Sequence, residues 1–331
     1  MRPRAGRTVY YRKARGGNVT NLAPHSGEGV RVIFGDSRNM KEVKDNSVGL
    51  VLTSPPYYNA PFDFPDLFPS YTDYLNMINE AGKEIFRVLE EGRVAVFVAG
   101  DVRIDGELYP IVADLIKIMQ SLGFKYQERI IWKKPEIYIK ISKRSGVLIQ
   151  HPYPLYYYPD NIYEEIIVFK KPGKFISRNK EESKIDINKF QKEKWYLNIW
   201  EIANVLPQDK YSKYSSPFPE ELARRIITLY SYVDDTVLDP FTGTGTTLKV
   251  AHELKRNVIG YEIDLELKHI ILERIGVNTL FGKRQVEIIE REDAKRLRTK
   301  LREKIEEKLQ RKRLREQKVS QTGISQVKWW D

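Results

Sequence analysis

Two short loops of this chain carry residue types that could bind a flat ligand and act on it. The first is Thr53-Ser54-Pro55-Pro56-Tyr57. Its two prolines donate no backbone hydrogen bond and stiffen the loop, so that carbonyl oxygens are left free to accept at a fixed position. Acceptors held beside an aromatic ring suit a group that bears an exocyclic NH₂. The structural alternative is a rigid Pro-Pro turn with a tyrosine in the core.

The second loop is Asp239-Pro240-Phe241-Thr242-Gly243-Thr244-Gly245-Thr246-Thr247, which follows a short apolar run and opens a helical pattern. Its glycines allow a ligand to approach the backbone, and the N–H groups of a helix N-terminus can bind it. The loop lacks the third glycine of the dinucleotide fingerprint and the Gly-Lys-Ser/Thr of a P-loop, so a plain tight turn remains an alternative.

An acidic residue, Glu262, ends the next apolar run, 17 residues past Gly245. A carboxylate at this place can accept hydrogen bonds from ribose hydroxyls, and it could instead cap the following helix. The glycine-rich loop and this acid together favour an adenosine-containing cofactor.

The composition excludes several chemistries. The chain has no cysteine, so disulfides, thiolate metal clusters and cysteine nucleophiles are ruled out. Its four histidines are scattered, and we expect no metal site. No apolar stretch approaches the roughly 20 residues of a membrane helix, and the Arg-rich start lacks the apolar centre of a secretory signal. We therefore expect a cytoplasmic protein.

The net charge of +11 is unevenly distributed. Residues 1–15 carry six basic and no acidic side chains, residues 283–318 carry a net +7, and residues 133–214 a net +6. The rest of the chain is acidic. A polyanion such as nucleic acid would be attracted to these three regions. Lys- and Glu-rich surfaces are also common in proteins from hot environments, so charge alone leaves both interpretations open.

Alternating apolar runs and helical patterns predict an α/β fold with a mainly parallel sheet. Strands are predicted at 30–34, 48–52, 94–98, 126–132, 162–169, 236–238 and 257–262, and helices at 71–89, 111–122, 217–232, after 247 and at 265–275. Ligands of such sheets lie beyond the carboxyl ends of the strands. Asp36, Ser54 and Asp101 each follow a predicted strand, so we expect them at one edge of the sheet.

The order of the motifs resembles that of the S-adenosylmethionine-dependent DNA amino-methyltransferases, in particular the permuted beta class, in which the catalytic loop precedes the cofactor loop. The resemblance covers about residues 30–275. It implies a doubly wound, Rossmann-like methyltransferase fold with a small inserted target-recognition region. It rests on GDS at 35–37, TSPPY at 53–57, SPFPEELARRI at 216–226, DPFTGTGTT at 239–247 and GYEID at 260–264.

The resemblance also implies the catalytic residues, which would be Ser54, Pro55, Pro56 and Tyr57. The Ser54 hydroxyl and the Pro55 carbonyl would accept from the target NH₂, and Tyr57 would stack on the base. Methylation at cytosine C5 needs a thiolate that adds to the ring, which this chain lacks, whereas an amino nitrogen can attack the sulfonium methyl directly. The base must first be flipped out of the duplex, which costs a few kcal/mol.

S-adenosylmethionine would be the cofactor. By the same resemblance, Asp36 would contact its adenine and Glu262 its ribose. One departure concerns the methionine carboxylate, because Tyr214-Ser215 stand where the family commonly has His-Pro. The residues expected around the methionine end are Asp239, Phe241, Gly243, Gly245 and Thr246.

The residue before the two prolines bears on the target base. Serine is more frequent there in cytosine-N4 enzymes, and Asp or Asn in adenine-N6 enzymes. Ser54 therefore predicts cytosine N4 of double-stranded DNA as the target. Adenine N6 is the alternative, followed by an RNA amino group or an inactive nucleic-acid-binding homologue. A companion restriction endonuclease would suit this family.

The resemblance divides the chain into five parts. They are a basic extension (1–29), a catalytic half (30–132), a target-recognition region with one core strand near 162–169 (133–214), a cofactor-binding half (215–282) and a charged extension expected to be helical (283–331).

The target-recognition region would meet DNA through its lysines and through polar or aromatic side chains. Tyr156, Tyr157 and Tyr158 suit base contact and packing under a loop equally well. Trp195 and Trp200 are expected in the core.

Overall fold

The computed structural model describes residues 29–60, 66–104, 106–136, 143–205, 209–211, 216–277, 286–304, 306–307 and 310–311. Nine strands of this described part form one sheet. Strand β7 is antiparallel to both of its neighbours, and the other pairs are parallel. The spatial order is β11 (Val286–Glu290), β1 (Val30–Phe34), β10 (Asn257–Glu262), β9 (Thr236–Asp239), β2 (Val48–Thr53), β3 (Leu89–Ala99), β7 (Tyr163–Lys170), β6 (Lys125–Lys133), β8 (Ile199–Glu201).

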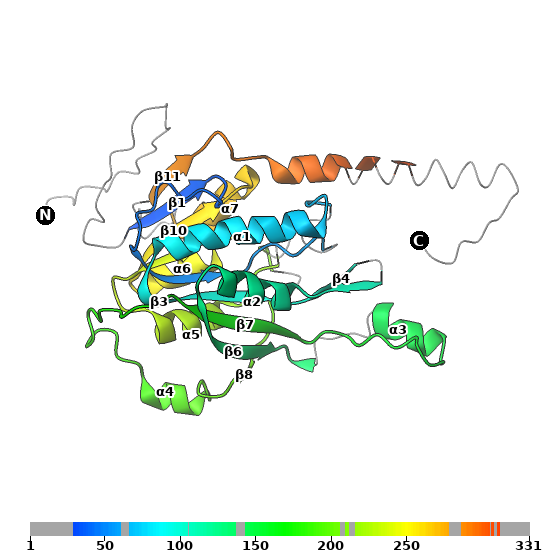
Figure 1. The fold of residues 1–331 in the computed structure, drawn as a ribbon, viewed down its shortest axis with the longest axis horizontal. Coiled ribbons are helices and arrows are strands. Elements are labelled where there is room, and N and C mark those ends of the chain that lie inside the picture. The colour runs from blue at the N-terminus through cyan, green and yellow to red at the C-terminus, as the bar shows by residue number, and fades with distance from the viewer. Residues whose placement is uncertain are drawn as a thin grey trace, which may run out of the picture.

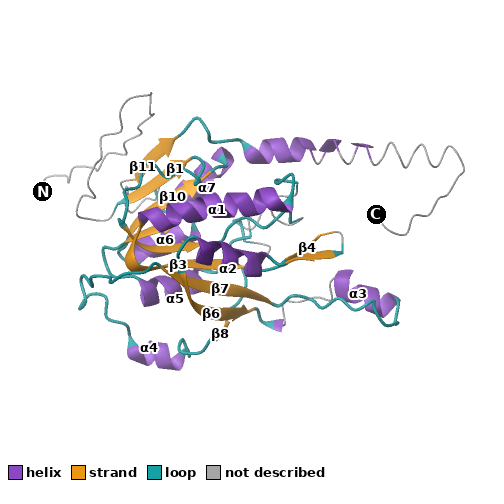
Figure 2. Ribbon diagram, viewed as in Figure 1, coloured by secondary structure: helices purple, strands orange, loops and turns teal. Residues whose placement is uncertain are grey.

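Helices cover both faces of this sheet. Helices α1 (Tyr71–Val88) and α2 (Ile111–Ser121) pack on one face, as Figures 1 and 2 show. The opposite face carries α5 (Glu220–Tyr230), α6 (Thr246–Glu253) and α7 (Lys268–Arg274). Because both faces are covered, the parallel strands are continuous apolar runs, and all six residues of β2 are buried.

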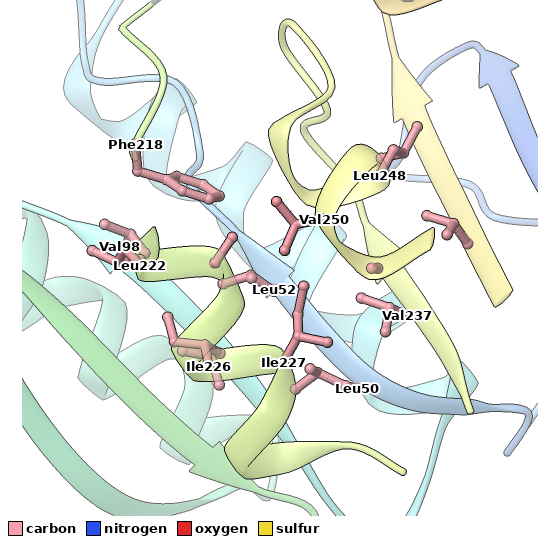
Figure 3. Packing of buried hydrophobic residues seen from close by; sticks show 14 of the residues in the cluster. Leu50, Leu52, Val98, Phe218, Leu222, Ile226, Ile227, Val237, Leu248 and Val250 are labelled. Atoms are coloured by element: carbon pink, nitrogen blue, oxygen red, sulfur yellow. The ribbon is translucent and has the colours of Figure 1, made fainter. Parts of the chain in front are cut away.

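The two cores are built by alternate residues of the same strands, whose side chains point to opposite faces. Leu50 and Leu52 of β2 pack under α5 and α6, together with Val237 of β9 (Figure 3). Val51, between them, packs on the α1 side. Strand β2, which leads to the TSPPY loop, is thus packed between the helices on the two faces of the sheet.

Helix α1 shows how local sequence sets an element of the site. Its apolar residues Tyr74, Ile78 and Ile85 recur at helical spacing and are buried. Ser70 is the N-cap of the helix, because its hydroxyl accepts from the Asp73 N–H at 3.1 Å. This cap fixes the first turn of α1, which faces the TSPPY loop across the cavity described below.

The carboxyl ends of the parallel strands lie along one edge of the sheet. The chain leaves β2 through α1 to β3, whereas it leaves β9 through α6 to β10, on the other side. The boundary between β2 and β9 is therefore a topological switch point, where such folds open a crevice. Since β7 is antiparallel, its first residues lie at this same edge, with Glu165 opposite Ala99.

The predicted α/β architecture is confirmed, but several elements differ from the sequence prediction. Residues 286–290 are strand β11, where a helical extension was expected from residue 283; helix begins only at residue 297. Val286 and Ile288 of this strand are buried. They form a short alternating pattern within a stretch of mostly charged residues. The hairpin of β4 (Val102–Ile104) and β5 (Glu107–Tyr109) was not predicted, nor was β8.

The region between 133 and 214 holds more regular structure than the single strand expected from sequence. It contains α3 (Lys143–Gln150), α4 (Ile187–Lys192) and β8. Trp195 and Trp200 are buried as expected, whereas Tyr157 is exposed. Of the basic extension 1–29, only residue 29 lies within the described part.

Three segments extend from the carboxyl edge in the same direction: the β4–β5 hairpin, α3 and the helix from residue 297 (Figure 1). In the part of the chain that the structure describes, every helix is too short or too polar to traverse a bilayer.

We expect Leu52→Ala to lower the free energy of unfolding by about 2–5 kcal/mol, because Leu52 is fully buried below α5. Urea denaturation measures the loss. Leu108→Ala, at a half-exposed position of β5, is the matched control and should change stability by less than about 0.5 kcal/mol. Equal values for the two variants would contradict the packing described here.

Candidate active site

A cavity of about 430 Å³ opens at the carboxyl edge, around the boundary between β2 and β9. Its walls are the loops after β1, β2, β9 and β10, the first turn of α1, residues 216–218 and two residues beyond β11. The cavity brings together nearly all residues singled out in the sequence. These are Asp36, Ser54, Pro55, Pro56, Tyr57, Asp239, Phe241, Gly243, Thr246 and Glu262.

Two predicted positions lie outside the lining. Gly245 is the residue before α6 and has a φ of +90°, so it determines the backbone path of the glycine-rich loop without lining the cavity. Asp101 follows β3 as predicted, but its carboxylate accepts from the Val112 N–H at 3.1 Å, at the start of α2. Tyr214 and Ser215 lie outside the described residues.

The TSPPY loop is tied to the glycine-rich loop by one buried hydrogen bond. The Thr53 hydroxyl donates to Asp239 Oδ1 at 2.7 Å, across the β2–β9 boundary. The same oxygen accepts from the Phe241 N–H at 3.1 Å. Burial raises the pKa of Asp239 to about 6, although hydrogen bonds from Thr247, Thr53 and Phe241 oppose this rise. The Asp239 side chain therefore fixes the distance between the two loops.

Tyr57 is held by a pair of residues that the sequence did not single out as site residues. Its hydroxyl donates to Glu164 Oε2 at 2.8 Å, and Lys134 Nζ donates to Glu164 Oε1 at 2.7 Å. Glu164 reaches this edge only because β7 is antiparallel, and the buried run of β7 gave no sign of its direction. Lys134 belongs to the basic segment after β6. The ring orientation of Tyr57 is thus set by a charged pair.

The glycine-rich loop is pinned to Glu262. Gly243 N–H donates to Glu262 Oε2 at 2.8 Å, and Asp264 N–H donates to Oε1 at 2.9 Å. Gly243 has a φ of +54°, a conformation that favours glycine. Burial and the charge of Asp264 raise the pKa of Glu262 to about 8, against the two backbone hydrogen bonds and Arg298. A carboxyl group is thus held at the cavity at a cost in desolvation.

Asp36 follows β1, which is separated from β2 and its TSPPY loop by β10 and β9. Its carboxylate accepts from the Arg38 backbone N–H and from the Arg38 guanidinium. Burial alone would raise the pKa of Asp36, but the contacts with Arg38 outweigh it, so the pKa lies below its usual value. Asp36 is therefore a charged acceptor that already has one partner.

These residues fit an adenosine-containing cofactor. The volume lies within the range of ligand pockets. Glycine backbone is exposed to the cavity, and buried carboxyl groups stand at two neighbouring strand ends, β9 and β10. The described residues hold no group of three or more side chains that could bind a metal ion.

Comparisons with known proteins agree with this geometry. The DNA methylase family model matches residues 48–273. The type II methyltransferase M.MjaI of Methanocaldococcus jannaschii is 36% identical over 287 residues, which cover 75% of this chain and 91% of that protein.

Two solved structures share the fold. A DNA modification methylase from Thermus thermophilus, solved with S-adenosyl-L-methionine, has 28% sequence identity and a TM-score of 0.63, covering 79% of this chain and 98% of its own. The cytosine-N4-specific PvuII DNA methyltransferase has 20% identity and a TM-score of 0.58, covering 78% of this chain and 90% of its own, a likeness of fold alone.

The chain belongs to the DNA methylase family, whose members transfer methyl groups to N6 or N4 amino groups. It is a DNA methyltransferase, and its TSPPY loop and glycine-rich loop line one cavity.

We expect Thr53→Val, which keeps the shape and removes the hydroxyl, to cost about 1–3 kcal/mol of stability, because buried Asp239 loses a donor. The pKa of Asp239 should rise above about 6, since this hydrogen bond lowers it. Denaturant unfolding and an NMR titration of the carboxyl group measure the two effects. Thr53→Ser keeps the hydroxyl and is the control; a loss of the same size there would show that the methyl group, not the hydrogen bond, matters.

Proposed function

We propose that this protein methylates the N4 amino group of cytosine in double-stranded DNA, with S-adenosylmethionine as methyl donor. The observation that carries the proposal is Ser54, the residue before the two prolines, in a loop that lines one cavity with Gly243 and Glu262. Serine at this place is typical of the cytosine-N4 enzymes that the motifs resemble.

The cofactor would be held along the strand ends β1, β10 and β9. Asp36 would bind its adenine and Glu262 its ribose. When bound, S-adenosylmethionine supplies an electrophilic methyl group on a sulfonium. The loop after β9 would hold its methionine end, through Asp239, Phe241, Gly243, Gly245 and Thr246.

The chain's own catalytic task is to position the amino nitrogen. The Ser54 hydroxyl and the Pro55 carbonyl would accept the two amino hydrogens, so that the lone pair turns from the ring toward the cofactor. Pro56 keeps the loop rigid, and Tyr57 would stack on the flipped base. Since Tyr57 is held by Glu164, its ring is fixed before the base arrives. No protein nucleophile is needed, which agrees with a chain that has no cysteine.

The segments that extend from this edge would carry the DNA. We propose that residues 133–214 contain the target-recognition surface, flanking β7, between the catalytic half (30–132) and the cofactor-binding half (215–282). The exposed side chains of Tyr153, Leu155 and Tyr157 suit contact with a nucleic acid. A similar protein is named a type II methyltransferase, and we propose a companion restriction endonuclease as a partner of this protein.

Incubation with methyl-labelled S-adenosylmethionine and mixed-sequence duplex DNA, then nucleoside digestion and mass analysis, tests the function. We expect 4-methylcytosine. Finding 6-methyladenine would overturn the target base, and label in RNA alone would overturn the DNA substrate. Cofactor binding without any transfer would overturn catalysis.

Ser54→Ala should reduce turnover by about 10²-fold or more, because one acceptor for the amino group is lost. Its affinity for the cofactor should stay unchanged in calorimetry. Ser121→Ala, at an exposed position of α2, is the matched control and should retain full activity. A fully active Ser54→Ala variant would contradict the assigned role.

Cofactor binding should tighten as pH rises through about 8. Glu262 has a raised pKa of about 8 and is protonated below it, whereas ribose hydroxyls need a carboxylate acceptor. Binding must then expel the proton, so affinity should increase by up to about tenfold per pH unit below pH 8 and level off above it. Titration calorimetry of Glu262→Gln should show weaker binding with a flatter pH profile; a profile as steep as that of the wild type would assign the proton elsewhere.

A further inference from the structure

The cavity has a wall that lies outside the segment matched by the DNA methylase family. Lys295 and Leu297, beyond β11, line it, whereas the family match ends at residue 273. They lie beside the ends of β1 and β10, because the Lys295 N–H donates to the Ile263 carbonyl at 2.8 Å. Ile263 lines the cavity too. This wall is therefore at the opposite end of the strand row from Ser54.

The chain before this wall is fastened to the loop after β1. Arg291 N–H donates to the Phe34 carbonyl at 2.8 Å, and its guanidinium donates to the Asn39 carbonyl at 2.6 Å. A Cβ on Gly35 would lie 2.6 Å from Arg291 Cδ, so the Arg291 side chain occupies the space that any larger residue would need. Asp36 N–H also faces Asp293 Oδ2, at 3.4 Å.

The chain after the wall is fastened to the loop after β10. Leu265 N–H donates to the Lys295 carbonyl at 3.1 Å, which closes a bridge between Asp264 and Lys295. Arg298 Nε lies 3.1 Å from Asp264 Oδ2, and the Asp264 side chain is completely buried. The Thr299 hydroxyl donates to Glu266. Residues 291–299 are thus a strap held at both ends by buried groups, with Leu297 between them.

We propose that Leu297 is a cofactor-binding residue, whose side chain packs against the adenosyl part of S-adenosylmethionine; this rests on the proposed function. Three observations lead there. Leu297 is a half-buried apolar side chain in the wall of the cavity that Ile263 also lines. The neighbouring strand ends carry Asp36 and Glu262, the acceptors for adenine and ribose. The strap contacts the loops after β1 and β10, not Ser54 or Tyr57, so it does not lie where the methyl-accepting base would bind.

A flat adenine ring has two apolar faces that need cover from water, and an aliphatic side chain supplies it without competing for hydrogen bonds. Polar acceptors at the ring edge then set orientation, while Leu297 and Ile263 supply contact area. The strap makes this wall rigid, so little ordering is needed on binding.

Calorimetry of the full chain with two probes, S-adenosylmethionine and 5′-methylthioadenosine, tests the assignment. Leu297→Asn, of similar size but polar, should weaken both by the same factor, about fivefold or more. Leu297→Met should stay within about twofold of the wild type. Lys300→Ala, an exposed change on the same helix and outside the cavity lining, is the matched control and should leave both affinities unchanged.

Wild-type affinity of Leu297→Asn for both probes would overturn this inference and leave the proposed function standing. A weaker affinity for S-adenosylmethionine alone would overturn the adenosyl contact. A wild-type protein that binds neither probe would instead refute the proposed function. Should Leu297→Asn not fold, Leu297→Phe decides in its place: the proposal requires a changed affinity for 5′-methylthioadenosine, and an unchanged one overturns it.

Discussion

The pairing of β2 with β9 is the constraint on which the site depends. The Cα register sets Leu50 opposite Val237 and Val51 opposite Leu238. The carboxyl ends of β2 and β9 therefore lie side by side at the same edge of the sheet. The Thr53–Asp239 hydrogen bond then joins them across 186 positions of sequence. Because the TSPPY loop and the glycine-rich loop reach the cavity from neighbouring strand ends, their order along the chain does not matter. A permuted motif order gives the same site as long as these strands remain neighbours.

The buried carboxyl groups of the site lower the stability of the free protein. Asp239 and Glu262 have raised pKa values because burial penalises their charged forms. Backbone N–H groups and threonine hydroxyls offset part of this penalty. Such groups are concentrated at functional sites, where a ligand completes their hydrogen bonds. Glu262 illustrates this, since it both holds the Gly243 loop and faces the cavity.

Local sequence was sufficient to predict the central strands, and the motifs of the family resemblance contain most of the residues that line the cavity. Buried parallel strands are continuous apolar runs, and residues at their carboxyl ends must meet at one edge. This rule placed Asp36 and Ser54 in the cavity lining, whereas Asp101 follows β3 at the same edge but lies outside the lining and binds the start of α2. It could not give the direction of β7, because a strand buried on both faces reads the same in either direction. Glu164 was therefore missed.

Strand β11 and the strap that follows it were missed for a different reason. Val286 and Ile288 are two apolar residues in a stretch dominated by charge, and their pairing with β1 spans more than half of the chain. An alternation this short does not by itself indicate a strand. Arg291 and Arg298 read as solvated charges in sequence, yet both are largely buried, where they bind a main-chain carbonyl and a carboxylate.

Glu164 connects the TSPPY loop to the region that would recognise DNA. One of its oxygens binds the Tyr57 hydroxyl, and the other binds Lys134, at the point where the chain leaves β6 toward α3. A shift of Lys134 therefore changes the environment of the carboxylate that orients Tyr57. Since both contacts are partly buried, solvent screens them less than it screens surface ion pairs. The Tyr57 ring and the start of the segment that extends from the sheet edge are thus positioned by a single side chain.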